Sequence, residues 1–398
     1  MKNLYFDKEK TFWISLLPLF LALYLLFSMV SISLSQIFLS FAFICWTVIL
    51  IQKKQKFIFP SFFWPLIVYI VLSLVSSFLS INPETSLKDS KELLLFLIVP
   101  MVYMGFFKEN ALKKANLALL ASACLSCLYS IFYFFFKASP GERIAGFMGH
   151  VMTQGGLLLI FSCIALSMLL FSSGRIRYLW GLGFLLSLIA LILTQNRNAW
   201  VGLVVVASLI LFLYKPRTLI IVPLAIGLFY IASPQPIKKR VLSSFSLVSN
   251  MNRIELMSAG IKIIKDFPFF GTGPSTVEIA FKNPKYGLSE GGKASVHLHN
   301  NILQIGAERG IPTLLAWLTF MVWAFISLLK ILKNKDSTLL PFTVAALAAL
   351  LALFIAGLFE YNFADSEITM LFLYMITIPF SLARIQRKKV KDPKVQVS

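Results

Sequence analysis

Residues 295–315 read Ser-Val-His-Leu-His-Asn-Asn-Ile-Leu-Gln-Ile-Gly-Ala-Glu-Arg-Gly-Ile-Pro-Thr-Leu-Leu, a polar stretch that runs directly into an apolar one. From Asn300 onward the apolar residues follow helical spacing, and Asn300, Gln304 and Glu308 recur every four residues as a polar stripe. Gly310 and the proline two residues beyond it are typical of a helix end followed by a new helix start. The stretch therefore predicts a short polar helix that leads into a membrane-spanning helix.

Two of the three histidines of the chain, His297 and His299, lie at the start of this predicted helix. The positive end of the helix dipole disfavours an imidazolium there and favours a neutral imidazole that can accept a proton. The alternative interpretation is a histidine that only forms hydrogen bonds at a membrane interface. A zinc site made of His150, His297 and His299 lacks a closed ligand set, so we expect no metal.

The composition of the chain indicates an all-α polytopic membrane protein. Hydrophobic residues make up 58% of its 398 residues, and the mean hydropathy is +0.82. About twelve apolar windows are suited to form transmembrane helices. They lie near residues 12–30, 33–51, 62–79, 93–107, 116–136, 152–172, 178–194, 199–214, 218–232, 312–329, 338–359 and 368–383.

These windows divide the chain into three parts. Residues 1–232 hold nine predicted transmembrane helices, residues 233–311 form a long loop with amphipathic helices, and residues 312–398 hold three more helices and a basic tail. Lysine and arginine concentrate in every second loop and in both termini, which places the termini in the cytoplasm and the long loop outside. The net charge of +20 is thus a signal of membrane topology, and we expect no nucleic-acid partner.

Three arginines lie on the predicted outer side, where short loops normally contain few cations. Arg143 and Arg197 are in short outer loops, and Arg253 is in the first turn of an amphipathic helix predicted over residues 250–267. A cation at a helix start is unfavourable unless it has an anionic partner or is solvated. Each arginine alone could reach a lipid phosphate, but Arg143 and Arg197 on the same face as His299 favour a functional site there over two separate lipid contacts.

Two further features of the long loop fit such a site. Residues 271–274, Gly-Thr-Gly-Pro, form a tight turn whose backbone amides could bind an anion. Residues 282–294 contain Asn-Pro, Tyr-Gly and Gly-Gly pairs, and they resemble a mobile flap above a binding site.

Four segments of the chain resemble the O-antigen ligase family. Their patterns are an arginine followed by Gly-Phe and His, Thr-x-x-Arg-x-x-Trp-x-Gly, an arginine followed by Pro-x-x-Gly-x-Gly, and His-Asn-x-x-Leu-Gln-x-x-x-Glu-x-Gly. They lie at residues 143–150, 194–202, 253–273 and 299–310. Most of the second half of the chain carries the resemblance.

The resemblance implies a membrane glycosyltransferase of the bacterial inner membrane. An O-antigen ligase transfers a glycan from undecaprenyl pyrophosphate to a sugar hydroxyl of lipid A–core, at the periplasmic face and without a cofactor or metal. His299 would be the general base, and Glu308 would orient His299 or the acceptor. Arginines would hold the pyrophosphate, with help from other polar groups. This expected binding set comprises Arg143, Arg197, Arg253, Asn300 and His297.

Three alternatives stay open at this point. An O-antigen polymerase, or an oligosaccharyltransferase to protein, of the same fold would use the same residues with another acceptor. A transporter of anions or lipid-linked sugars belongs to another class of protein. Transport sites usually place ionisable groups near the middle of the membrane, whereas the predicted spans hold none and the polar groups gather at one face. The pattern therefore favours chemistry at the membrane surface.

Overall fold

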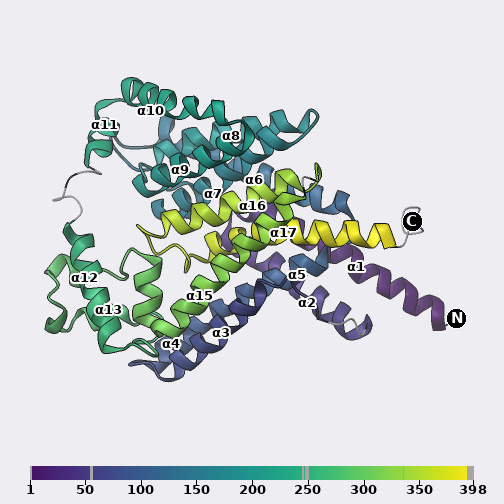
Figure 1. The fold of residues 1–398 in the computed structure, drawn as a ribbon, viewed down its shortest axis with the longest axis horizontal. Helices are drawn as coiled ribbons and strands as arrows, with labels where there is room; N and C mark the ends of the chain where they lie inside the picture. Colours follow the sequence, from purple (N-terminus) through teal and green to yellow (C-terminus); the bar gives the residue numbers. More distant parts are fainter. Residues whose placement is uncertain (1, 54–56, 244–245, 247–250, 335, 392–398) are drawn as a thin grey trace.

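The computed structural model describes residues 2–53, 57–243, 246, 251–334 and 336–391, and only the backbone for residues 2–11, 236 and 388–391. The regular structure of these residues is helical, which confirms the all-α class (Figure 1). The first half comprises α1 (Lys2–Phe27), α2 (Ile32–Lys53), α3 (Phe63–Phe78), α4 (Pro83–Asp89), η1 (Ser90–Leu97), α5 (Ile98–Gly105), α6 (Glu109–Phe136), η2 (Gly146–Met148), α7 (Val151–Phe171) and α8 (Ile176–Leu193). The second half comprises α9 (Arg197–Tyr214), η3 (Pro216–Ile220), α10 (Ile221–Ala232), α11 (Gln235–Leu242), α12 (Met251–Asp266), α13 (Val277–Phe281), η6 (Pro284–Tyr286), α14 (Glu290–Lys293), α15 (Asn301–Lys333), α16 (Leu340–Ala356) and α17 (Ser366–Lys391).

Each predicted transmembrane window coincides with helical structure, but the helices differ in length. Within the described residues, seven are long and apolar enough to cross a membrane: α2, α6, α7, α8, α9, α15 and α17. Shorter apolar helices cover Phe12–Phe27, Phe63–Phe78, Pro216–Ala232 and Leu340–Ala356. The window at 93–107 is divided between η1 and α5. Seven membrane-crossing helices are therefore supported, and the full set of twelve stays a prediction.

The centre of the bundle is formed by α7 and α17. The most apolar window of each of these helices is 83% buried, compared with 28% for α8 on the outside of the bundle. Helices α16, α8 and α9 pack around α7, and α5 packs against α17. Most apolar side chains of the central helices are thus enclosed by protein, which makes them a rigid base for the loops at their ends.

The segment from α11 to α14 lies at one end of the bundle, beside the start of α15 (Figure 1). Its longest helix, α12, ends at Asp266, just before Pro268 as the sequence predicts. Leu256, Ala259 and Ile263 are the buried face of α12. The other apolar side chains at helical spacing, Ile254, Met257 and Ile261, are exposed. The helix carries two apolar stripes, and the stripe with the small residues Ala259 and Gly260 packs inward because it allows close approach to Leu298.

Helix α15 is broken at Gly310, which has φ of 82° and ψ of 169°. The break leaves backbone groups unpaired, since Pro312 has no N–H to donate to the Glu308 carbonyl. The turn at 271–274 compensates for this loss: the amide of Gly273 donates to the Glu308 carbonyl at 2.8 Å, and the amide of Thr272 to the Ala307 carbonyl at 2.9 Å. The expected anion-binding role of these amides is therefore wrong, because they cap the broken helix.

We predict that Gly310→Ala destabilises the protein. This backbone conformation is accessible almost only to glycine, at a cost of about 1–3 kcal/mol for other residues. An added Cβ would also collide with the Phe269 carbonyl. Thermal unfolding in detergent should show a transition lowered by several degrees. Gly227→Ala is the matched control, because a Cβ at Gly227 in α10 meets nothing within 4 Å. Equal transition temperatures for the two variants would contradict this account.

Candidate active site

His299 lies immediately before α15 and has a left-handed backbone conformation, with φ of 50°. The next residue, Asn300, is the N-cap of the helix, and its Oδ1 accepts a hydrogen bond from the Leu303 amide at 3.0 Å. The Nδ2 of the same side chain donates to the Leu358 carbonyl at 2.9 Å. Asn300 thus fixes the start of the helix and joins it to the loop after α16.

Asn301 completes the connection between α15 and this loop. Its amide donates to the Gly357 carbonyl at 2.7 Å, and its Nδ2 donates to Asn362 Oδ1 at 2.8 Å. The Asn362 amide donates back to Asn301 Oδ1 at 3.1 Å. Because both side chains are buried, the loop of residues 357–365 is held firmly beside His299.

The loop places Glu360 against both histidines, and we call His297, His299 and Glu360 the histidine–glutamate cluster. Glu360 Oε1 lies 3.0 Å from His299 Nδ1 and 3.5 Å from His297 Nε2. The His299 amide donates to His297 Nδ1 at 3.2 Å. Glu360 is 7% exposed, and its second oxygen, Oε2, is buried without a hydrogen-bond partner in the structure.

The surroundings of the cluster determine its protonation. Burial by itself would raise the pKa of Glu360, but the hydrogen bond from His299 and the positive charge of Arg253 outweigh it and lower that pKa. An ionised carboxylate only accepts hydrogen bonds, so His299 donates from Nδ1, and in the neutral imidazole the lone pair is then on Nε2. Burial lowers the pKa of His297 to about 4 despite the nearby carboxylate. His297 is therefore neutral at physiological pH.

A second group of residues gathers at the turn between α8 and α9. Arg143 donates from Nε to the Thr194 carbonyl at 3.2 Å, and Arg240 of α11 donates from Nε to the Gln195 carbonyl at 3.3 Å. Arg253 of α12 donates from Nη1 to Asn198 Oδ1 at 3.3 Å. With Arg197, which is part of the turn itself, these residues form what we call the arginine cluster.

The positive charges of the arginine cluster act on one another. Burial and the charges of Arg240 and Arg197 lower the pKa of Arg143. Burial also lowers the pKa of Arg253, where Glu360 acts in the opposite direction and Arg240 adds to the lowering. A set of guanidinium groups that destabilise each other's charge favours the binding of an anion, which relieves the repulsion.

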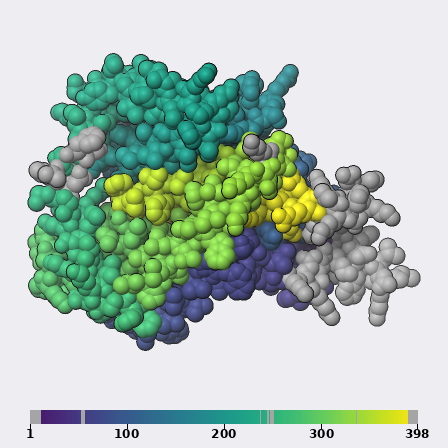
Figure 2. Space-filling model, viewed as in Figure 1, coloured from purple at the N-terminus to yellow at the C-terminus, as the bar shows by residue number. Residues whose placement is uncertain are grey.

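Asn198 connects the two clusters. Its Oδ1 accepts the hydrogen bond from Arg253, and its Nδ2 donates to the Phe359 carbonyl at 3.1 Å, next to Glu360. Figure 2 shows the loop after α16, in yellow, reaching the surface between the teal and green parts of the chain that supply the arginines. A carboxylate-bound imidazole thus lies beside the arginine cluster.

Comparison with known proteins agrees with this geometry. Residues 182–318, from within α8 to within α15, match the family model described as O-antigen ligase. This match supports the O-antigen ligase family for the chain. The matched segment includes Arg197, Arg240, Arg253 and His299, whereas Glu360 lies outside it. No curated protein matches the chain.

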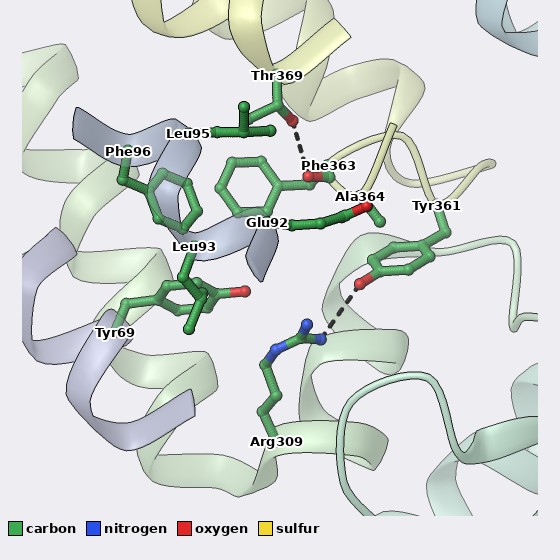
Figure 3. Close-up of a pocket in the computed structure, with 10 residues that line it drawn as sticks. All are labelled: Tyr69, Glu92, Leu93, Leu95, Phe96, Arg309, Tyr361, Phe363, Ala364 and Thr369. Carbon is green, nitrogen blue, oxygen red and sulfur yellow. Dashed lines mark hydrogen bonds between the residues drawn. The ribbon is translucent and has the colours of Figure 1, made fainter. Parts of the chain in front are cut away.

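Glu308 lies away from His299, contrary to the role expected for it. It follows His299 by nine residues, so the helix separates the two by about 13 Å. Its Oε2 instead accepts a hydrogen bond from Arg309 Nη1 at 3.1 Å. Arg309 also donates to Asp89 at 3.4 Å. The Tyr361 hydroxyl accepts a hydrogen bond from Arg309 at 3.2 Å (Figure 3). The carboxylate that contacts His299 is Glu360, and Glu308 belongs to a buried ion-pair network.

The histidine–glutamate cluster offers the three ligands of a metal site, since its ligand atoms all lie within 4.8 Å of one another. This set differs from the one weighed from the sequence, because Glu360 takes the place of His150. The charges of Arg143 and Arg253 act on Glu360 and oppose the approach of a divalent cation. The same charges favour an anionic substrate.

Two residues of the site were missed from the sequence. Arg240 ends a Lys-Lys-Arg run in the long loop, where basic residues were not assigned individually. Glu360 is in the short loop between the last two predicted spans, which contains no lysine or arginine. The available signal for Glu360 was an acidic residue in a short loop between two apolar helices. For Arg240 it was an arginine on the same predicted side of the membrane as Arg143, Arg197 and Arg253.

We predict that Arg240→Gln weakens the binding of inorganic pyrophosphate to the purified protein by about tenfold. Hydrogen bonds to charged groups contribute about 1.5–3 kcal/mol, and part of this is lost to solvent in an open site. Isothermal titration calorimetry in detergent measures the change. The matched control is Arg175→Gln, because Arg175 precedes α8 at the end opposite the cluster. An unchanged affinity in Arg240→Gln would exclude Arg240 from anion binding.

The lowered pKa of His297 predicts a pH dependence of stability. The unfolded chain binds a proton at His297 below about pH 6.5, whereas the folded protein resists it until about pH 4. This contribution to stability is therefore present at neutral pH and is lost as the pH falls through that window. Between pH 7 and 4.5 the free energy of unfolding of the wild type should fall by about 1–2 kcal/mol more than that of His297→Gln. Parallel unfolding curves for the two proteins across this range would refute the assignment.

Proposed function

We propose that the protein is an O-antigen ligase that transfers a glycan from undecaprenyl pyrophosphate to a sugar hydroxyl of lipid A–core. The observation that carries the proposal is the arrangement of His299. Its Nδ1 is held by Glu360, which leaves Nε2 as the accepting nitrogen of the neutral imidazole, and Asn198 ties the Glu360 loop to the arginine cluster. A base beside a phosphate-binding group is what glycan transfer from a pyrophosphate requires.

His299 acts as the general base in this proposal. The acceptor oxygen forms a bond to the anomeric carbon of the donor, while the bond from that carbon to the pyrophosphate oxygen breaks. The hydroxyl proton passes to His299 Nε2, and the bonding electron pair leaves with undecaprenyl pyrophosphate. Glu360 orients the imidazole and stabilises the imidazolium that forms. His297 keeps the backbone of His299 in place through its Nδ1.

The arginine cluster binds the donor and stabilises the leaving group. Negative charge grows on the pyrophosphate as the sugar departs, and guanidinium groups offer paired donors that match phosphate oxygens. Arg197 and Arg253 are the proposed main contacts, and Arg143 and Arg240 complete the cluster. Asn300 has a positioning role rather than a contact with substrate, since both ends of its amide are already engaged.

The reaction is proposed to take place at the periplasmic face of a bacterial inner membrane. The start of α15, the start of α9 and the loop after α16 all lie at one end of the bundle (Figure 1). The distribution of lysine and arginine assigns this end to the outside and both termini to the cytoplasm. A lipid-linked donor and a lipid-linked acceptor would meet there at the level of the headgroups.

We predict that His299→Ala lowers the rate of transfer by roughly 10²–10⁴-fold, because the proton of the acceptor hydroxyl loses its base. Donor binding should stay near the wild-type value, since the arginine cluster is intact. The assay uses purified protein with undecaprenyl-pyrophosphate glycan and lipid A–core. Glu360→Gln should also be impaired, whereas Glu84→Gln, which removes an exposed carboxylate paired with Lys88, should not.

The same assay separates the alternatives. Glycan on lipid A–core, without chain growth when the core is omitted, supports the ligase. Chains that lengthen without core indicate a polymerase that uses the same site. Transfer by His299→Ala at the wild-type rate would overturn the assignment of the base, and a wild-type protein without any transfer would return the transporter to consideration.

A further inference from the structure

A groove runs along the side of the bundle between α2 and the η1–α5 segment. Its volume is about 560 Å³, which is within the range of small-molecule sites. Leu39, Phe43 and Ile44 of α2 form one wall, and Leu94, Ile98 and Met101 form the other. Residues 36–44 of α2 extend about 12 Å along the helix axis, so the groove is elongated along the helices.

One end of the groove is polar. Gln36, Lys91 and Ser366 lie there, and Ser366 is the first residue of α17, directly after the loop that holds Glu360. The polar end is therefore at the same end of the bundle as His299. Burial, together with the charge of Asp89, raises the pKa of the adjacent Glu92 to about 7. At neutral pH this carboxyl only partly offsets the positive charge of Lys91.

Two shared residues place the groove next to a small cavity on the side of the active site. Glu92 and Leu95 line both the groove and a small cavity whose other residues include Arg309 and Tyr361 (Figure 3). The ring of Tyr361 lies 6.2 Å from the ring of His297, centroid to centroid. A ligand with an apolar part in the groove and a polar part at its end would reach toward the histidine–glutamate cluster.

This approach is distinct from that of the arginine cluster. On one side, the carbonyl of Phe359 in the loop of residues 357–365 accepts a hydrogen bond from Asn198, which also bonds Arg253. On the other side, toward α3 and η1, the hydroxyl of Tyr361 in the same loop bonds Arg309. The pyrophosphate donor requires the dense positive charge of the arginines. The groove offers one lysine and a long apolar wall, which suits an acyl chain beside a phosphate group.

We propose that the groove seats an acyl chain of the anionic acceptor lipid, with Lys91 at the lipid phosphate and the attached saccharide extending to His299. This inference rests on the proposed function, because it names where the acceptor of that reaction binds. The donor would then approach His299 from the arginine side and the acceptor from the groove side.

Filling the groove tests the proposal by kinetics. Ser40 lines the groove and is exposed, so Ser40→Trp should fold and block the apolar wall. We expect the KM for lipid A–core to rise about tenfold, with no change for a deacylated core saccharide or for the donor. Ile37→Trp is the matched control, because Ile37 is exposed on α2 but does not line the groove. Equal effects of both variants, or a raised donor KM, would overturn the proposal.

A binding experiment separates this proposal from the proposed function. Lipid A with a photoactivatable diazirine in one acyl chain is bound to the full-length protein in nanodiscs and cross-linked. Labelled peptides should map to residues 36–44 and 94–101, and unlabelled lipid A, but not undecaprenyl phosphate, should compete. Labelling there without transfer activity would support the groove and refute the ligase. Transfer activity with labelling spread evenly over lipid-facing helices would refute the groove and keep the ligase.

Discussion

The site depends on holding four positive charges close together at the turn between α8 and α9. Two like charges about 6 Å apart repel by roughly 3 kcal/mol at the effective dielectric of a protein surface. The turn offsets this cost by presenting the carbonyls of Thr194 and Gln195 and the amide oxygen of Asn198 to three of the guanidinium groups. Each arginine comes from a different segment of the chain. The turn therefore brings the arginines together, and the remaining repulsion is what a phosphate-containing ligand would relieve.

The same end of the bundle shows how a broken helix is used. The break at Gly310 and Pro312 separates a polar helix from the apolar remainder of α15, and the amides of Thr272 and Gly273 restore its lost hydrogen bonds. The α12–α14 segment is thereby attached to the helix that carries His299 at its start. This attachment fixes the position of Arg253 in α12 relative to His299.

Charge divides the surroundings of His299 into two sides. On one side are the arginines, whose charges are only partly balanced by Glu360. On the other side Arg309 is enclosed by Glu308, Asp89 and Tyr361, which makes it part of the scaffold. A donor that carries several negative charges and an acceptor with an apolar chain would consequently follow different routes to the same base. That separation would favour transfer between two lipid-linked substrates over reaction with water.

The sequence by itself determined the features that depend on local patterns. The helical windows, the Asn300 start, the break at Gly310 and the clustering of arginines and histidines at one end follow from spacing, capping and charge distribution. Only the tertiary structure decided that Glu360, and not Glu308, meets His299, that Arg240 joins the other arginines, and which stripe of α12 is buried. The reason is physical: Glu360 is 61 residues from His299 along the chain, and contacts over such separations are set by how helices pack. Hydrophobic periodicity contains no information on which loop ends will meet.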